Sequence, residues 1–226
     1  MSAPFTLVLE TSTPHASIGI ATADGGFTSR EFTSDRNHNG LLFKPLAELL
    51  DSLPVAALER VLVGSGPGSY SGTRVGIAAA QGVALAAGCQ AAAVPSLLAV
   101  PSVTAGAACL FIGDARRGSF WTARTAATQL TETPTLTDAT GLWTAVTAAL
   151  AHGVAVVSFD AASRFPDLGE LAAQVKLESP TAAGLWLAWQ HADAPTRAAW
   201  AAVPPQPIYL KPPHITAATR PWLVPS

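Results

Sequence analysis

The feature that most constrains this chain is a glycine-rich segment between a strand-like run and a helix-like run. Residues 64–76 read Gly-Ser-Gly-Pro-Gly-Ser-Tyr-Ser-Gly-Thr-Arg-Val-Gly, after the apolar residues 61–63 and before the alanine-rich residues 77–87. Glycines tolerate positive φ angles and let other backbone groups approach closely, so the segment predicts a tight turn from a strand into a helix. A helix that begins after such a turn presents free N–H groups, which suit an anion.

Neither of the two common phosphate-binding motifs occurs in this segment. A Walker A loop requires G-x-x-x-x-G-K-[ST], and no lysine lies between Lys44 and Lys176. A Rossmann fingerprint requires G-x-G-x-x-G and a later acidic residue, yet neither Asp nor Glu occurs between Glu59 and Asp114. Either the glycines serve the turn and helix packing, with a Ser or Thr as N-cap, or the loop binds an anion. The residues that the second interpretation involves are Gly66, Gly68, Ser69, Ser71, Gly72 and Thr73.

The composition indicates a chain with little surface charge. Hydrophobic residues make up 49% of the 226 residues and charged residues 12%, whereas roughly 25% is usual for the charged share. This indicates a surface that a partner covers in part, or a bias toward alanine. The net charge of −2 argues against a protein that grips nucleic acid on its own. Two cysteines give no disulfide framework, and no secretory signal or bilayer-spanning run is evident, so we expect a cytoplasmic protein without membrane contact.

Apolar periodicity predicts an α/β chain whose first half is the better defined. Alternating residues and the turn Asp24-Gly25-Gly26 indicate a three-stranded antiparallel meander. Leucines at helical spacing then predict a helix that Pro54 ends, and Gly88 is typical of a residue that ends a helix. The elements expected in this half are strands over 5–10, 16–21, 27–32, 61–63 and 91–94 and helices over 42–53 and 73–87.

The second half of the chain has a different character. It carries all six tryptophans, and proline becomes frequent toward the end. The elements expected there are strands over 109–113, 119–125 and 154–158, helices over 139–151 and 181–190, and an extended tail over 204–213. No internal repeat is evident.

Residues suited to catalysis or metal binding are scattered. No two of the five histidines have the His-x-x-x-His spacing that places two imidazoles on one helix face. No Ser-His-Asp, Cys-His or paired-carboxylate arrangement occurs at short range, so we expect no metal site and no catalytic residue. Glu10, followed by Thr-Ser-Thr at a strand end, either holds a phosphate-bound cation or stabilises a turn, and the turn is the simpler interpretation.

Taken together, several segments resemble the TsaB (YeaZ) family, a bacterial subunit of the machinery that makes N6-threonylcarbamoyladenosine beside the tRNA anticodon. Residues 66–76 carry most of the resemblance. The other matching segments, in family order, are 7–13, the His38 segment with Leu41-Leu42 and Pro45-Leu46, 94–97, 114–116 and 207–212. The shortness of the chain and the missing His-x-x-x-His indicate TsaB rather than the related TsaD.

This resemblance implies an actin-like ATPase fold (ASKHA, RNase H-like) of two lobes, each with a mixed sheet flanked by helices. We expect a first lobe over 1–100 that carries the partner-binding helices, and a smaller second lobe over 101–226 whose tail packs back on the first. The implied role is that of a non-catalytic subunit that pairs with a TsaD-like transferase and is joined by a TsaE-like ATPase. The chain is expected to contact tRNA only indirectly and to form a homodimer in isolation. No cofactor is assigned to it, and ATP or ADP is expected only in the complex.

The resemblance also implies that the two first-lobe helices form the partner face. Its candidate residues are His38, Leu41, Leu42, Pro45, Leu49, Tyr70, Arg74, Ile77, Ala80, Gln81 and Ala84. An arginine at Ala80 or Ala84 is expected to block close approach of a partner helix. The sequence departs from the family at Glu10, where Asp is usual, at Tyr70-Ser71 in place of Phe-Thr, and at Thr73 in place of Leu. Two other functions remain: an ATP-dependent small-molecule phosphotransferase and a glycoprotease-like peptidase, which the lack of metal ligands disfavours.

Overall fold

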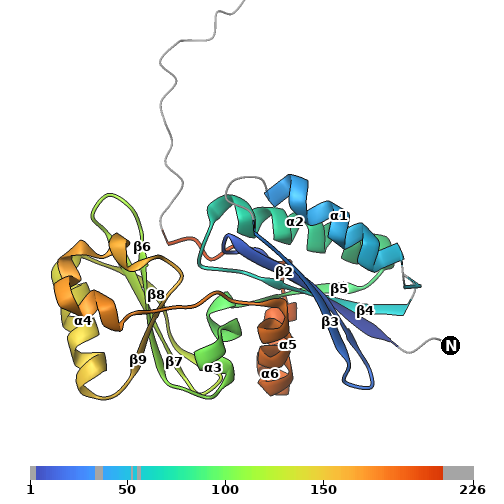
Figure 1. Cartoon of the computed structure of the whole chain (residues 1–226). Coiled ribbons are helices and arrows are strands. Elements are labelled where there is room, and N and C mark those ends of the chain that lie inside the picture. The colour runs from blue at the N-terminus through green and yellow to red at the C-terminus, as the bar shows by residue number, and fades with distance from the viewer. Residues whose placement is uncertain (1–3, 34–37, 52, 55–56, 211–226) are drawn as a thin grey trace, which may run out of the picture.

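Two five-stranded sheets form the centres of two lobes that lie side by side in the computed structural model (Figure 1). The structure describes residues 4–33, 38–51, 53–54 and 57–210. The first sheet has the strand order β3-β2-β1-β4-β5. Its strands are β1 (Phe5–Glu10), β2 (His15–Thr22), β3 (Phe27–Thr33), β4 (Leu58–Gly64) and β5 (Gln90–Val94).

The central strand β1 is buried along its whole length, because both faces of the first sheet are covered. On one face lie α1 (His38–Asp51) and α2 (Tyr70–Ala87), which pack on Leu7 and Leu9. On the other face Val8 packs against α5 (Ala182–His191). Alternate residues of one strand therefore belong to two different cores, as the two-residue period of a strand dictates.

The second sheet repeats the topology of the first, with the order β10-β9-β6-β7-β8. In each sheet a meander of three antiparallel strands is followed by two strands that join parallel to the first. This duplicated arrangement is the actin-like, RNase H-like architecture, so the expected fold class is confirmed. The strands are β6 (Cys109–Asp114), β7 (Phe120–Ala126), β8 (Gln129–Thr137), β9 (Ala155–Ser158) and β10 (Lys176–Leu177).

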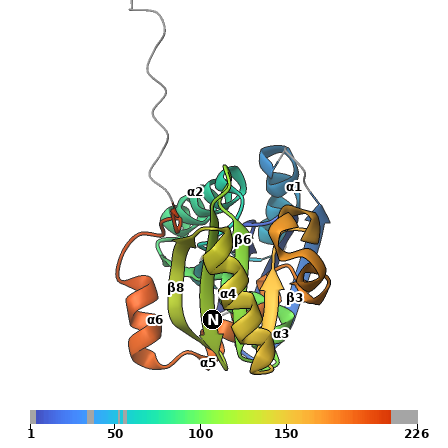
Figure 2. The same cartoon turned by 90° about the vertical axis from the view of Figure 1, so that its left-hand side faces the viewer.

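Helix α4 (Ala139–Ala151) covers the second sheet, as the view onto that lobe in Figure 2 shows. Asp138 begins this helix by accepting a hydrogen bond from the Gly141 N–H at 2.8 Å. Two 3-10 helices follow β9 before the chain reaches β10, and they take the place that α2 has in the first lobe. They are η3 (Ala162–Arg164) and η4 (Pro166–Gln174).

The end of the chain returns to the first lobe. Helix α5 packs on the first sheet, and α6 (Ala194–Ala201) packs along its edge strand β5. Gly184 lets α5 approach closely, because a Cβ atom there would lie 2.1 Å from the Ala99 carbonyl oxygen. The boundary between the lobes at residue 100 stays a prediction. The structure shows that residues 182–201, although they follow the second sheet in the chain, pack on the first sheet.

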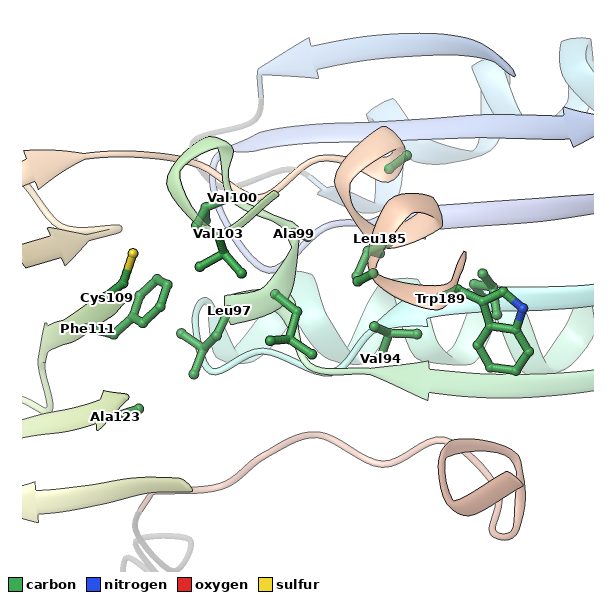
Figure 3. Close-up of a cluster of buried hydrophobic side chains, with 14 of the residues drawn as sticks. Val94, Leu97, Ala99, Val100, Val103, Cys109, Phe111, Ala123, Leu185 and Trp189 are labelled. Atoms are coloured by element: carbon green, nitrogen blue, oxygen red, sulfur yellow. The ribbon is translucent and has the colours of Figure 1, made fainter. Parts of the chain in front are cut away.

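An apolar cluster of described residues joins the lobes, and we call it the inter-lobe cluster. Figure 3 shows Cys109, Phe111 and Ala123 of the second sheet on one side and Leu185 and Trp189 of α5 on the other. Between them lie the 3-10 helix η2 (Ser96–Ala99) and the short helix α3 (Pro101–Thr104). Because these side chains interlock, the two lobes share one core.

Most expected elements occur, with shifted ends. The meander, the glycine turn and the N-cap serine are found, and Gly88 ends α2 with a φ of 68°. Helix α2 begins at Tyr70 instead of Thr73, and α1 covers 38–51 instead of 42–53, with Pro45 inside it. Strand β8 and helix α6 were not expected from the sequence.

Candidate functional site

The glycine-rich turn, which we call the elbow (residues 64–73), connects β4 to α2. Gly66 has a φ of 82°, a left-handed conformation that favours glycine. Ser69 begins α2, because its hydroxyl accepts a hydrogen bond from the Gly72 N–H at 3.2 Å. This is the N-cap that the sequence predicts.

The β1–β2 connection fills the inner side of the elbow. The Ser69 N–H donates to the Ser12 carbonyl oxygen at 2.6 Å, and the Thr11 hydroxyl donates to the Gly72 carbonyl oxygen at 2.8 Å. A Cβ atom on Gly68 would lie 2.2 Å from the Ser12 carbonyl oxygen. These contacts support the packing role of the glycines, and anion binding by the elbow stays a prediction.

The carboxylate of Glu10 is fully buried where β1 ends. It accepts hydrogen bonds from the Ser12 N–H at 2.6 Å and from the Ser96 hydroxyl at 2.7 Å. A Cβ atom on Gly64 would lie 2.0 Å from Glu10 Oε2, so the carboxylate occupies the space that this glycine leaves open. Burial raises the pKa of Glu10, although its hydrogen bonds oppose the shift. Both carboxylate oxygens are thus engaged in contacts within the protein, which supports the turn-stabilising interpretation.

The raised pKa of Glu10 makes a prediction about stability. A carboxyl group with a raised pKa in the folded state stabilises the protein at low pH, and this contribution is lost as pH rises above 4.5 and through the folded pKa. The free energy of unfolding of the wild type, minus that of Glu10→Gln, is therefore expected to be larger at pH 5 than at pH 8. Urea denaturation of both proteins at the two pH values measures this difference. An equal difference in the free energy of unfolding at both pH values would contradict a raised pKa of Glu10.

Five candidates for the partner face belong to the core of the first lobe. They are Leu42, Leu49, Ile77, Ala80 and Ala84. Ala80 has 0% exposure because it faces the sheet beneath α2. An arginine at Ala80 or Ala84 would therefore disturb the fold before it could block a partner. This corrects the expectation that those two positions probe a surface.

The other candidates lie at or near the surface of the same two helices. Leu41 is 42% exposed and Tyr70 59% exposed, while Arg74 and Gln81 are exposed and Pro45 is half-buried. The side chain of His38 lies outside the described residues. For these positions the interface role stays a prediction.

The predicted partner-face residues do not include the outward face of α2, which we call the docking stripe (Ala78, Gly82 and Leu85). Leu85 is 84% exposed, and a Cβ atom on Gly82 would meet nothing within 4 Å. The spacing of three and four residues places the stripe on one side of the helix. This spacing could have indicated the stripe. Because α2 has apolar residues on all sides, however, its sequence does not show which side faces outward. Phe43 on α1 is also exposed and was missed.

The second lobe has a charged turn at the position equivalent to Glu10. Asp114 ends β6, and its carboxylate pairs with Arg116 at 3.1 Å and with Arg164 at 3.7 Å. The Asp114 N–H donates to the carboxylate of Asp160 at 2.9 Å.

Among the described residues no group of three or more His, Cys, Asp or Glu could hold a metal ion. Within that same part of the chain, no helix is long and apolar enough to cross a membrane.

Comparison with solved structures identifies the fold. YeaZ from Pseudomonas aeruginosa superposes with a TM-score of 0.66 at 21% identity, over 92% of this chain and 100% of that one. A second structure, an uncharacterized protein with similarity to peptidase YEAZ from Pseudomonas aeruginosa, gives 0.64 at 20% identity, over 93% and 100%. No curated protein matches the chain at a significant level.

The comparison of sequences with family models agrees with the fold. The model described as "TsaD: tRNA N6-adenosine threonylcarbamoyltransferase" matches residues 16–164, more than half of the chain. The match includes the elbow, α1 and α2, and it continues through the second lobe to η3. The resemblance that the sequence carries is thus confirmed: the chain has the fold of YeaZ and belongs to the TsaD family.

Proposed function

We propose that this chain is a non-catalytic subunit needed for N6-threonylcarbamoyladenosine modification of tRNA. It pairs with a TsaD-like transferase and activates it. Membership of the TsaD family supports the pathway, and one observation supports the role: the docking stripe lies uncovered on α2. Small residues that let a helix approach closely, beside an exposed leucine that the approach would bury, suit a helix–helix interface.

The docking stripe fits a helix of the partner. Ala78 and Gly82 lack bulk, so another helix can approach the α2 backbone closely. Leu85 then supplies apolar area, and burying a leucine side chain is worth about 1.5–3 kcal/mol. Leu41 and Phe43 on the neighbouring helix α1 are also exposed. The same face supports the expected homodimer when the partner is missing.

The centre of the molecule supports a role without catalysis. In the first lobe the Glu10 carboxylate is engaged by Ser12 and Ser96, and between the lobes lies the inter-lobe cluster. A phosphotransferase of this fold would need room between its lobes for nucleotide. ATP turnover or proteolysis by the purified chain alone, above that of a mock preparation, would contradict the proposed role.

Leu85→Arg is expected to abolish capture of a TsaD-like partner, because a charge would replace the most exposed apolar side chain of the stripe. The affinity is expected to fall at least about 100-fold, the scale of an interface hot spot. Calorimetric titration of the two purified subunits measures it.

Leu177→Arg is the matched control, since Leu177 is also exposed but lies on β10 of the second lobe. It should bind like the wild type. If Leu85→Arg binds normally, the docking stripe is not the interface. If both variants lose binding, the effect is not specific to α2. If light scattering shows that the wild type is a dimer and Leu85→Arg a monomer, the docking stripe also forms the homodimer. Adding a TsaE-like ATPase to the pair of subunits tests whether it joins them as the third component.

A further inference from the structure

Two exposed tyrosines from distant parts of the chain meet at the start of α2. The ring centroids of Tyr70 and Tyr209 are 5.9 Å apart, and the Arg74 guanidinium lies 5.0 Å from the centroid of the Tyr70 ring. Arg74 also donates a hydrogen bond to the Tyr70 hydroxyl. Tyr209 is 53% exposed, so both rings remain open to solvent. We call Tyr70, Arg74 and Tyr209 the aromatic patch.

The tail of the chain holds Tyr209 in place. The Ile208 N–H donates to the Ser65 carbonyl oxygen in the elbow at 2.9 Å. The Gln81 side-chain amide donates to the Pro205 carbonyl oxygen at 3.0 Å, and Pro205 is buried. These hydrogen bonds hold the backbone that leads into Tyr209, and the contact with Tyr70 orders its ring before any ligand arrives. Preorganised rings lose little conformational entropy on binding.

Arg74 places a positive charge within the aromatic patch. Within the described residues, Tyr70 is the one partner of the Arg74 guanidinium, which leaves most of its N–H groups open. No acidic residue lies in the first turn of α2, and the sequence has no Asp or Glu between Glu59 and Asp114. The exposed Ser71 hydroxyl lies one residue after Tyr70. The patch therefore offers π faces, a guanidinium and a hydroxyl, without a carboxylate on the same turn.

We propose that the aromatic patch binds an unpaired nucleotide of RNA. The base stacks on the tyrosine rings, and the Arg74 guanidinium pairs with the phosphate. The choice of RNA over a free nucleotide rests on the proposed function. The chain thereby gains a direct RNA contact, where the sequence predicts only an indirect one. With a net charge of −2, the chain holds one nucleotide in position and does not grip a length of backbone.

The aromatic patch and Leu85 of the docking stripe lie toward opposite ends of α2. Tyr70 and Leu85 are fifteen residues apart on α2, which is about 22 Å along a helix. Tyr70 begins α2 and contacts Tyr209, whereas Leu85 lies near the C-terminal end of the helix. A nucleotide stacked on Tyr70 therefore lies far from Leu85, although Arg74 is only one turn from Ala78 of the stripe.

The test is binding of a fluorescein-labelled, single-stranded 12-nucleotide RNA to the full chain, followed by fluorescence anisotropy. Tyr209→Ala is expected to weaken binding roughly 5- to 100-fold, the range of one stacked base. Arg74→Ala is expected to weaken binding and to remove most of its salt dependence, because the phosphate contact is lost. Tyr209→Phe, which keeps the ring, and Leu177→Ala, exposed on the other lobe, should bind like the wild type. The logarithm of the affinity should fall with the logarithm of salt concentration with a slope of about −0.7, the value for one phosphate on a single strand.

Three results would overturn the proposal. The first is equal RNA binding by the wild type and Tyr209→Ala. The second is competition by AMP at the same concentration as unlabelled RNA, which would assign the patch to a free nucleotide. The third is unchanged RNA binding with lost capture of the TsaD-like partner, which would make the patch a protein contact. The proposed function is tested separately. If the wild type captures the TsaD-like partner and Leu85→Arg does not, the proposed function stands whichever of these three results is found.

Discussion

Ala80→Arg is expected to unfold the first lobe, at a cost of more than about 4 kcal/mol in the free energy of unfolding. Ala80 is fully buried on the face of α2 that packs on the sheet, among Leu42, Val61 and Ile77. An arginine there must either bring an unpaired charge into an apolar core or push the helix off the strands. Thermal denaturation followed by circular dichroism should show loss of the cooperative transition.

Ala78→Arg is the matched control for this prediction. Ala78 lies two residues earlier on the same helix, has the same side chain and is exposed. Its arginine variant should fold with a stability within about 0.5 kcal/mol of the wild type, yet lose affinity for the partner because the residue belongs to the docking stripe. A stably folded Ala80→Arg protein would contradict the burial of Ala80 between α2 and the first sheet.

Phe111→Ala is expected to lower the free energy of unfolding by about 3–5 kcal/mol. Phe111 on β6 is fully buried in the inter-lobe cluster, and its ring meets that of Phe159 at a centroid distance of 6.0 Å. The deletion leaves a cavity where the two lobes share a core. Urea denaturation should show one transition with a lower midpoint.

Phe43→Ala serves as the control, since Phe43 is exposed on α1 and should change the stability of the isolated chain by less than about 1 kcal/mol. A Phe111→Ala protein with two separate transitions, only one of them shifted, would mean that each lobe folds on its own and that the inter-lobe cluster does not couple them.

The sequence predicts the first lobe well because its signals are local. Ser69 as N-cap, Gly88 at the helix end and the Asp24-Gly25-Gly26 turn each act within a few residues. The family resemblance gave the fold, which agrees with the observed sheets. The resemblance implies two related lobes, and the two sheets do share a strand order, but the residues themselves showed no repeat because the likeness lies in strand order and not in residue identity.

The candidate site was harder to predict because its geometry is not local. Helix α2 is apolar on all sides, so its sequence could not distinguish Ala80, which faces the sheet, from Ala78, which faces outward. The contact of Tyr209 with Tyr70 joins positions 139 residues apart and leaves no trace in either segment. Burial of Glu10 likewise depends on Ser96 and on the missing side chain of Gly64.

The return of the chain end to the first lobe has a consequence for synthesis in the cell. The strands of the first sheet are complete at Val94, but α5, which covers one face of that sheet, begins about 90 residues later. At a translation rate of roughly 5–20 residues per second, the nascent sheet exposes Val8, Leu62 and Ala92 for several seconds. A chain that stops before residue 182 would keep that face bare permanently, so premature termination should yield an aggregating protein even though every strand of its first lobe is present.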